Sequence, residues 1–507
     1  MFTNRTISGY VDAIWPAEGR LLNLGHICLS DLHCGAPTGL LTPTDTDPGI
    51  GSDPARLVSD TFAKALLATV KIVNSGPPPA VIFLGDIFDL SLGQPAAATA
   101  VLRYFLDQLK MNGGVSAFGR FLFVPGNHDH ELWTALRYQQ QSDPPGSLDH
   151  VTPAFAATET WPGPALLDQL LKKSGFKFGC ATYYPNLGLR SKDGSRVVMF
   201  HHGHFVEAMY TLMSRLLSQL AGGEDLARTV ADMERINGSW IDFIWSTLGD
   251  DGLLGKDIFL AYEYLMTGGE TADFQHRLSR LIADKLAGSL PLWRTKAMRE
   301  ALDLIASGLV DSLAGSLGQL ERFSYTQVLG DGSLKGLKDY LDGPVWRQMG
   351  VELEGKMPTD MTFVFGHTHK PFEDRVPSSR FTFPPAVYNT GGWILDTPMF
   401  GTVEGASVLF VDDQLNTAAL RLFGAPADDG PALPGSTPVP VRVTTADGLA
   451  PGDNPMAAAL QASLVKTAPL WAAFAKAADA SYRDKQAYII ATLDRADAAA
   501  RRTGTVL

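Results

Sequence analysis

The feature that most constrains the fold is a short apolar run that ends in residues able to bind a metal. The run ends at Ser30, and Asp31 and His33 follow it with one residue between them. A run of this length is typical of a buried strand, and the Gly-Ala-Pro-Thr-Gly stretch after it is typical of a loop. Side chains two residues apart on an extended backbone point to the same side. Asp31 and His33 can therefore offer two ligands to a divalent metal, although Asp-x-His alone is a common pattern.

The same pattern recurs after four further apolar runs, at residues 80–84, 120–124, 196–200 and 361–365. The residues that follow these runs are Asp86, Asn127, His128, His202, His204, His367 and His369. Helix-type segments separate the first three runs, which predicts a parallel sheet with crossover helices. Because ligands of an open parallel sheet bind beyond the carboxyl ends of its strands, we expect these side chains to meet in one crevice.

Length, charge and cysteine usage narrow the class of protein. The 507 residues exceed what one hydrophobic core usually serves. The net charge of -12 argues against nucleic acid as the main partner, although a local basic pocket would escape this argument. The three cysteines show no metal-binding or disulfide spacing. We find neither a signal-peptide pattern nor an apolar run of about 18 residues, so we expect a cytoplasmic protein without a transmembrane helix.

Five short blocks resemble the signature blocks of the calcineurin-like metallophosphoesterases, in the family's order. The blocks are Asp31-x-His33, Gly85-Asp86-x-x-Asp89, Gly126-Asn127-His128-Asp129, His202-Gly203-His204 and Gly366-His367-Thr368-His369. The resemblance extends over about residues 24–411, apart from a helical insertion. It implies an α/β sandwich of two mixed β-sheets flanked by helices, with a two-metal site at the strand ends.

The resemblance also implies a role for each residue. The implied ligands are Asp31, His33 and His369 for a first metal, Asn127, His202 and His367 for a second, and Asp86 as a bridge between both. Mixed nitrogen and oxygen ligands suit two divalent ions of Mn, Fe or Zn. His128 would stabilise the transition state or protonate the leaving oxygen, with Asp129 orienting it. Asp89 lies either beside the ligands or in a solvent-facing loop, and His204 either contacts ligands or substrate or begins a helix.

The sequence divides into five segments. These are 1–204, the first part of the metallophosphoesterase core; 205–350, a helical insertion; 351–423, the second part of the core; 424–455, a linker rich in Pro and Gly; and 456–507, a helical segment. Inserted helices above a metal site commonly form a cap that shapes substrate choice. The aromatic residues and methionines of this insertion are compatible with an apolar substrate, and equally with a core of the insertion's own.

We therefore expect a hydrolase acting on ester bonds, in which a hydroxide bridging two metals attacks a phosphate ester of a small molecule or lipid in line. One alternative is a pyrophosphatase acting on a nucleotide-linked lipid, as in the UDP-diacylglucosamine pyrophosphatases. That branch has Asn-Arg where this chain has Asn127-His128. A second alternative is a scaffold without catalysis, although every implied ligand is present, and a nuclease is disfavoured by the charge.

The C-terminal segment leaves three alternatives open. It could pack on the core, pair two copies of the chain, or contact a membrane surface. Its basic residues are interleaved with aspartates, which argues against the membrane. The sequence does not choose between the other two.

Overall fold

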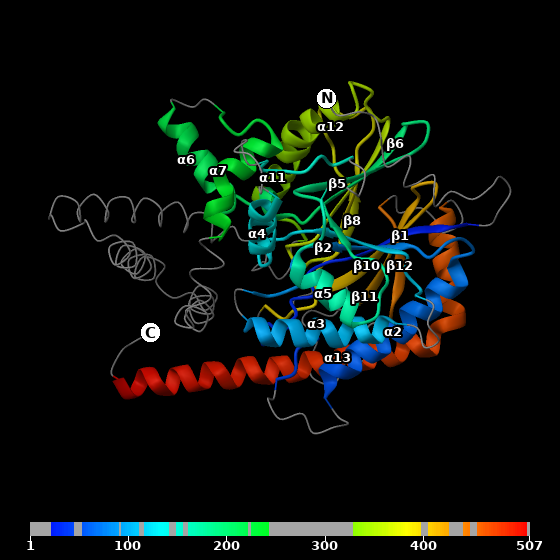
Figure 1. Ribbon diagram of the computed structural model, residues 1–507. Helices are drawn as coiled ribbons and strands as arrows, with labels where there is room; N and C mark the ends of the chain where they lie inside the picture. The colour runs from blue at the N-terminus through cyan, green and yellow to red at the C-terminus, as the bar shows by residue number, and fades with distance from the viewer. Residues whose placement is uncertain are drawn as a thin grey trace.

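The computed structural model describes residues 22–44, 53–90, 93–110, 116–140, 149–155, 161–221, 225–242, 328–396, 404–424, 440–446 and 454–503 (Figure 1). These residues form two mixed β-sheets flanked by helices, so the expected fold class is confirmed. Within the described ranges, none of the helices has the length and apolarity that crossing a membrane requires.

The first sheet has the strand order β12-β11-β10-β1-β2-β3-β4. Its strands are β1 (Leu24–Leu29), β2 (Ala80–Leu84), β3 (Arg120–Val124), β4 (Cys180–Thr182), β10 (Gly405–Asp412), β11 (Thr417–Gly424) and β12 (Arg442–Thr444). Strands β1 to β4 pair in parallel, and β10 pairs antiparallel with β1. The connecting helices are α2 (Pro54–Val73) and α3 (Pro95–Leu109). Helix α2 begins where the Asp53 side chain accepts a hydrogen bond from the backbone of Ala55 and Pro54 takes the first turn.

The second sheet has the order β5-β6-β7-β9-β8. Its strands are β5 (Asn186–Arg190), β6 (Arg196–His201), β7 (Asp360–Phe365), β8 (Phe372–Arg375) and β9 (Ala386–Asn389). Strands β6, β7 and β9 pair in parallel, although more than 150 residues of chain separate β6 from β7. The carboxyl ends of β6 and β7 therefore lie side by side.

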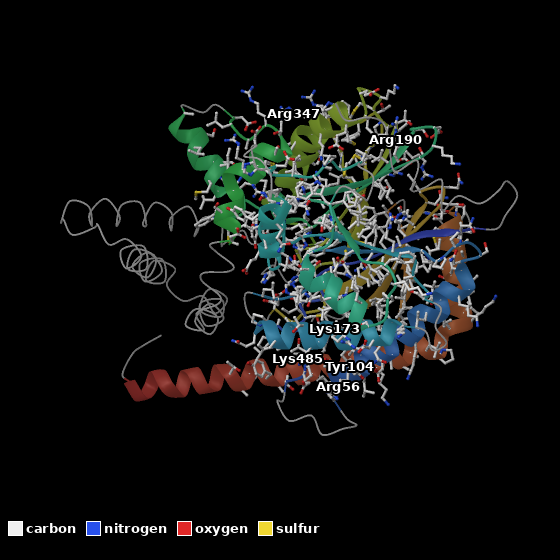
Figure 2. The ribbon with its side chains drawn as sticks, in the orientation of Figure 1. Arg56, Tyr104, Lys173, Arg190, Arg347 and Lys485 are labelled. Carbon is white, nitrogen blue, oxygen red and sulfur yellow. The ribbon has the colours of Figure 1, made fainter. Side chains whose placement is uncertain are left out.

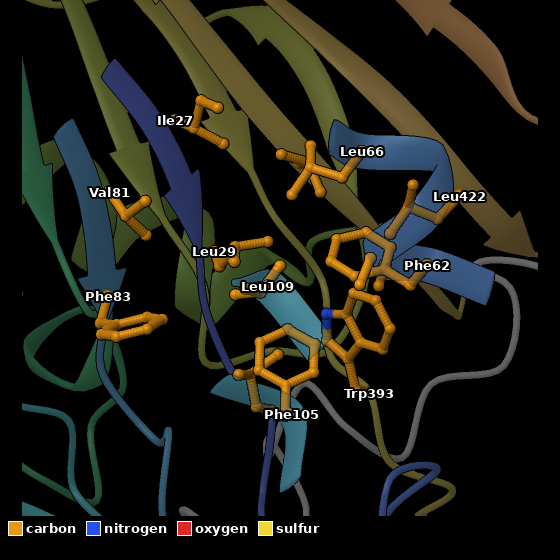
Figure 3. Packing of buried hydrophobic residues seen from close by; sticks show 14 of the residues in the cluster. Ile27, Leu29, Phe62, Leu66, Val81, Phe83, Phe105, Leu109, Trp393 and Leu422 are labelled. Atoms are coloured by element: carbon orange, nitrogen blue, oxygen red, sulfur yellow. The ribbon is translucent and has the colours of Figure 1, made fainter. Parts of the chain in front are cut away.

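Among the described residues, two large apolar clusters hold these layers together. Alternate residues of β1 and β2 point to opposite faces of the first sheet, and both faces are buried, which explains why these strands are apolar throughout. Cys28 and Ile82 pack in the core shared with the second sheet. Ile27 and Phe83 pack in the other core, beneath the helices, where Figure 3 shows them with residues of α2 and α3.

Further helices cover the sheets. They are α4 (His130–Gln140), α5 (Ala165–Lys173), η1 (His204–Val206), α6 (Leu212–Leu220), α7 (Val230–Asp242), α11 (Asp331–Tyr340), η4 (Leu341–Val345), α12 (Trp346–Glu352) and α13 (Pro455–Thr503). Tyr340 packs against Phe363 of the second sheet. Residues 243–327 of the expected insertion lie outside the described residues. Within the segment expected to be a linker, residues 442–444 form the edge strand β12.

The C-terminal helix packs on the core. Trp471 and Phe474 of α13 meet Phe62 of α2, with ring centroids 6.2 and 5.6 Å apart. The Trp471 indole also donates a hydrogen bond to Thr69 of α2, at 3.1 Å. Figure 1 shows α13 running along α2. Of the alternatives left open by the sequence, packing on the core describes this part of the helix.

Candidate metal centre

The side chains expected to bind metal lie where strands end, on a strained backbone. Asp31 and His33 follow β1, with φ angles of 49° and 44°, and Asp86 follows β2 with 50°. His367 and His369 follow β7, with φ angles of 70° and 58°. Residues other than Gly rarely adopt this left-handed backbone conformation, and Asp and His are among those that tolerate it best. Such strain persists where the surrounding structure enforces it, as at binding sites.

The first group of side chains consists of Asp31, His33 and His369, all buried. The Nε2 atoms of the two histidines lie 3.0 Å apart, and His369 Nε2 is 3.6 Å from Asp31 Oδ1. Each Nδ1 atom faces a carboxylate oxygen, that of Asp89 at 2.9 Å for His33 and that of Asp396 at 2.6 Å for His369. A carboxylate requires a donor, so each Nδ1 carries the proton and each Nε2 of a neutral ring presents a lone pair. Two converging lone pairs require a cation or a proton between them.

The second group contains Asp86, Asn127 and His202, with His367 beside them. His202 Nδ1 donates to the Leu84 carbonyl at 3.0 Å, which turns Nε2 towards the centre. This Nε2 lies 3.2 Å from Asp86 Oδ2 and 3.1 Å from Asn127 Oδ1. A carboxylate oxygen, an amide oxygen and an imidazole nitrogen thus converge, which is a donor set that first-row divalent metals accept.

Asp86 lies between the two groups. Its Oδ2 atom is 3.2 Å from His202 Nε2 and 3.8 Å from His33 Nε2. Its other oxygen, Oδ1, accepts the backbone N–H of His128 at 2.8 Å, which fixes the orientation of the carboxylate. Within the described part of the chain, Asp31 Oδ2 is buried without a hydrogen-bond partner, which is costly unless a cation binds it.

The charges of these groups depend on one another. Burial raises the pKa of Asp31 to about 7, although the nearby His202 opposes the effect. For Asp86, burial raises the pKa, but His202 and His128 outweigh it and hold the pKa well below the usual value. For His202, burial lowers the pKa, but the Asp86 carboxylate outweighs it and raises the pKa to about 9. The pocket thus favours positive charge beside Asp86, and its residues fit a divalent metal.

His128 is oriented by Asp89 rather than by its sequence neighbour Asp129. Asp89 Oδ2 lies 3.3 Å from His128 Nδ1 and also contacts His33 Nδ1 at 2.9 Å. The Asp129 carboxylate instead accepts the backbone N–H groups of Gly126 and Ile87, at 2.6 and 2.9 Å. The contact expected of Asp129 is therefore made by Asp89, which is buried and does not face solvent.

His204 joins neither group. It begins η1, and its Nε2 lies 3.2 Å from the Tyr184 hydroxyl, which donates to Glu234 at 2.9 Å. His130 contacts the same Glu234 at 3.2 Å and Asp242 at 2.7 Å. This buried polar network connects helix α7, in the segment expected to be an insertion, with α4, which begins two residues after His128.

The sequence missed two carboxylates that contact the histidines. Asp396 contacts His369 Nδ1, and Glu207 Oε2 lies 3.0 Å from His367 Nε2. By the same acceptor argument, Glu207 leaves Nδ1 of His367 as the nitrogen that can bind metal. Glu207 follows the fourth block closely and could have been considered for that reason. Asp396 had no comparable signal, because its contact depends on how the segment after β9 folds back.

Comparison with known families agrees with this geometry. Residues 27–227 match the family model described as calcineurin-like phosphoesterase. This match supports membership in the calcineurin-like metallophosphoesterase superfamily, and together with the His and Asp groups it suggests a hydrolase that binds divalent metal. The match ends before His367 and His369, which the structure brings beside the matched blocks. No curated protein shows significant similarity to the chain.

Proposed function

We propose that the chain hydrolyses phosphate esters with two divalent metals held at the strand ends. The observation that carries this proposal is the position of Asp86 Oδ2 between His202 Nε2 and His33 Nε2, at 3.2 and 3.8 Å. A carboxylate oxygen placed between both groups in this way could be shared by two cations. Two such metals, when bound, lower the pKa of a shared water and neutralise phosphoryl oxygens.

The chain's own residues divide the remaining tasks. Asp31, His33 and His369 would hold one metal, and Asn127, His202 and His367 the other. The Asp89 carboxylate keeps the His128 Nδ1 proton facing it, at 3.3 Å. A proton given to the leaving oxygen would therefore come from His128 Nε2.

The insertion at 205–350 would act as a cap over this site. Its first residues already touch the centre: Glu207 contacts His367 at 3.0 Å, and the Tyr210 ring lies 4.9 Å from the His367 ring. A substrate that rearranges this segment would therefore also move a metal ligand. This contact supports a role of the insertion in substrate choice.

The test measures bound metal and turnover together. Apo protein is loaded with Mn²⁺ and dialysed, and hydrolysis of p-nitrophenyl phosphate and of bis-p-nitrophenyl phosphate is followed. We expect about two Mn²⁺ per chain, both lost in Asp86→Asn. His128→Ala should keep its metal and lose turnover by about 10²- to 10⁴-fold.

His150→Gln is the matched control, because His150 belongs to neither metal group and contacts Arg137 instead. It should keep both metal and turnover. Wild-type protein that takes up no Mn²⁺, or an Asp86→Asn variant that retains full turnover, would refute the proposal. The ester that is hydrolysed faster shows which substrate class to pursue.

A further inference from the structure

The loop that follows the first ligand block is buried and tightly held. We call residues 34–44 the ligand loop, because it begins directly after His33. Within it, Thr42 Oγ1 accepts the backbone N–H of Gly35 at 3.0 Å. Leu40 and Leu41 are buried. The position of this loop therefore constrains the backbone that carries Asp31 and His33.

Helix α13 contacts the ligand loop through three polar side chains. Ser481 donates a hydrogen bond to the Leu40 carbonyl at 2.8 Å, and Lys485 donates one to the Thr42 carbonyl. Asp484 accepts a hydrogen bond from the Thr44 hydroxyl at 2.8 Å. Figure 2 shows Lys485 on this helix.

Lys485 is the most unusual of these contacts. Its side chain is fully buried, which is rare for a lysine without a specific partner. A buried ammonium group is costly unless it is hydrogen-bonded, so its bond to the Thr42 carbonyl fixes helix and loop relative to each other. Asp484 Oδ2, 3.5 Å from Lys485 Nζ, adds a compensating charge.

Hydrogen bonds connect the ligand loop with the first metal group. The Leu40 N–H donates to the Trp393 carbonyl at 2.8 Å, and the Trp393 N–H donates to the Asp31 carbonyl at 2.9 Å. Three residues beyond Trp393, Asp396 contacts His369 Nδ1 at 2.6 Å. Three successive hydrogen bonds thus connect Ser481 of α13 with Asp31, and the segment from Trp393 to Asp396 extends the path to His369.

The second group is held from elsewhere in the described chain. His202 Nδ1 donates to the Leu84 carbonyl at the end of β2, and His367 Nε2 contacts Glu207 at the start of the insertion. Neither support comes from α13 or from the ligand loop. The supports of His202 and His367 therefore lie outside α13 and the ligand loop, whereas Cys34 of that loop pairs with Ile87 and Asp89 beside the shared Asp86.

We propose that α13 positions the first metal group, with Ser481 and Lys485 as positioning residues that hold the ligand loop against Asp31 and His369. The proposal rests on the proposed function, because it assumes that this group binds a metal. Loss of either contact should lower the affinity of the first group for its metal. The affinity of the second group should stay largely unchanged.

The experiment titrates full-length apo protein with Mn²⁺ by calorimetry. Reference variants His369→Ala and His202→Ala assign each binding step to the first or the second group. In Ser481→Ala and Lys485→Met we expect the affinity of the first step to fall by about tenfold, as for other residues that orient ligands. The second step should change by less than about twofold. Thermal unfolding of the apo proteins reports separately on stability.

Ser463→Ala is the matched control, because Ser463 is a buried serine of the same helix whose hydroxyl has no hydrogen-bond partner among the described residues. It should leave both steps unchanged. If Ser481→Ala and Lys485→Met do not fold, Thr44→Val removes the more peripheral contact to Asp484 and should still weaken the first step selectively.

Equal weakening of both steps, or no weakening in folded variants, would overturn the proposed role of α13 while the proposed function stands. Wild-type protein that binds no Mn²⁺ would overturn both. The two failures are thus distinguishable from the wild-type titration alone.

Discussion

The buried contact between His130 and two carboxylates makes the stability of the fold depend on pH. Burial lowers the pKa of His130, but Glu234 and Asp242 outweigh it and raise the pKa from 6.5 to about 10. The native state therefore holds this proton more tightly than the unfolded chain does. The resulting stabilisation is fully present below pH 6.5 and is lost as the pH rises through about 10.

The size of the effect follows from the same values. The two pKa values, 6.5 and about 10, differ by about 3.5 units, and each unit corresponds to about 1.4 kcal/mol. The upper limit is thus about 5 kcal/mol in the free energy of unfolding. We choose His130→Gln, because glutamine keeps hydrogen-bonding capacity but does not ionise in this range.

The assay is denaturant unfolding in EDTA at several pH values between 6 and 10, with the free energy extrapolated to water. The stability difference between wild type and His130→Gln should decrease steadily as the pH rises. Glu234→Gln removes the larger of the two favourable charges, so in that background the decrease should be smaller. A difference between wild type and His130→Gln that stays constant over this range would refute the reasoning.

Two further substitutions test the neighbourhood of the ligands. Glu207→Ala removes the carboxylate that orients His367. We therefore expect calorimetry to show that the Mn²⁺ affinity of the second group falls by about ten- to a hundredfold. Unchanged affinity would contradict the assigned contact. In Gly366→Ala the new methyl group would lie 2.0 Å from Asp31 Oδ2 and 2.7 Å from Ser30 Oγ. Asp31 must then move, and mass-spectrometric metal analysis should find that the first group has lost its metal. Two metals bound at wild-type affinity would show that Asp31 is not needed in this position.

Much of the fold could be predicted from the sequence because its strands are continuous apolar runs. The expected strands at 80–84 and 120–124 coincide with β2 and β3. The parallel pairing of these strands brings the residues after them together, so these ligand candidates needed no tertiary information. In contrast, His202, His367 and His369 follow strands of the second sheet. Asp86 and Asn127 were found in this way.

The residues that orient the histidines were harder to predict, because their contacts are long-range. Asp129 is adjacent to His128 in sequence, yet its carboxylate accepts hydrogen bonds from the backbone of Gly126 and Ile87 instead. Asp89, from a different loop, takes its place beside His128. The position of α13 was open for a related reason: an apolar stripe shows that a helix face must be covered, but not which surface covers it.

The left-handed backbone at the ligand positions limits how this centre could be re-engineered. Asp31 and His33 both have positive φ angles, as do His367 and His369. Only a small set of residue types, chiefly Asn, Asp, His and Gly, adopts that conformation at low cost. An attempt to change metal preference by introducing Glu or Met at these positions would therefore disturb the backbone before it altered the coordination chemistry. The backbone conformation limits which residue types can occupy these positions. Redesign would therefore have to begin with the surrounding carboxylates, such as Asp396 and Glu207.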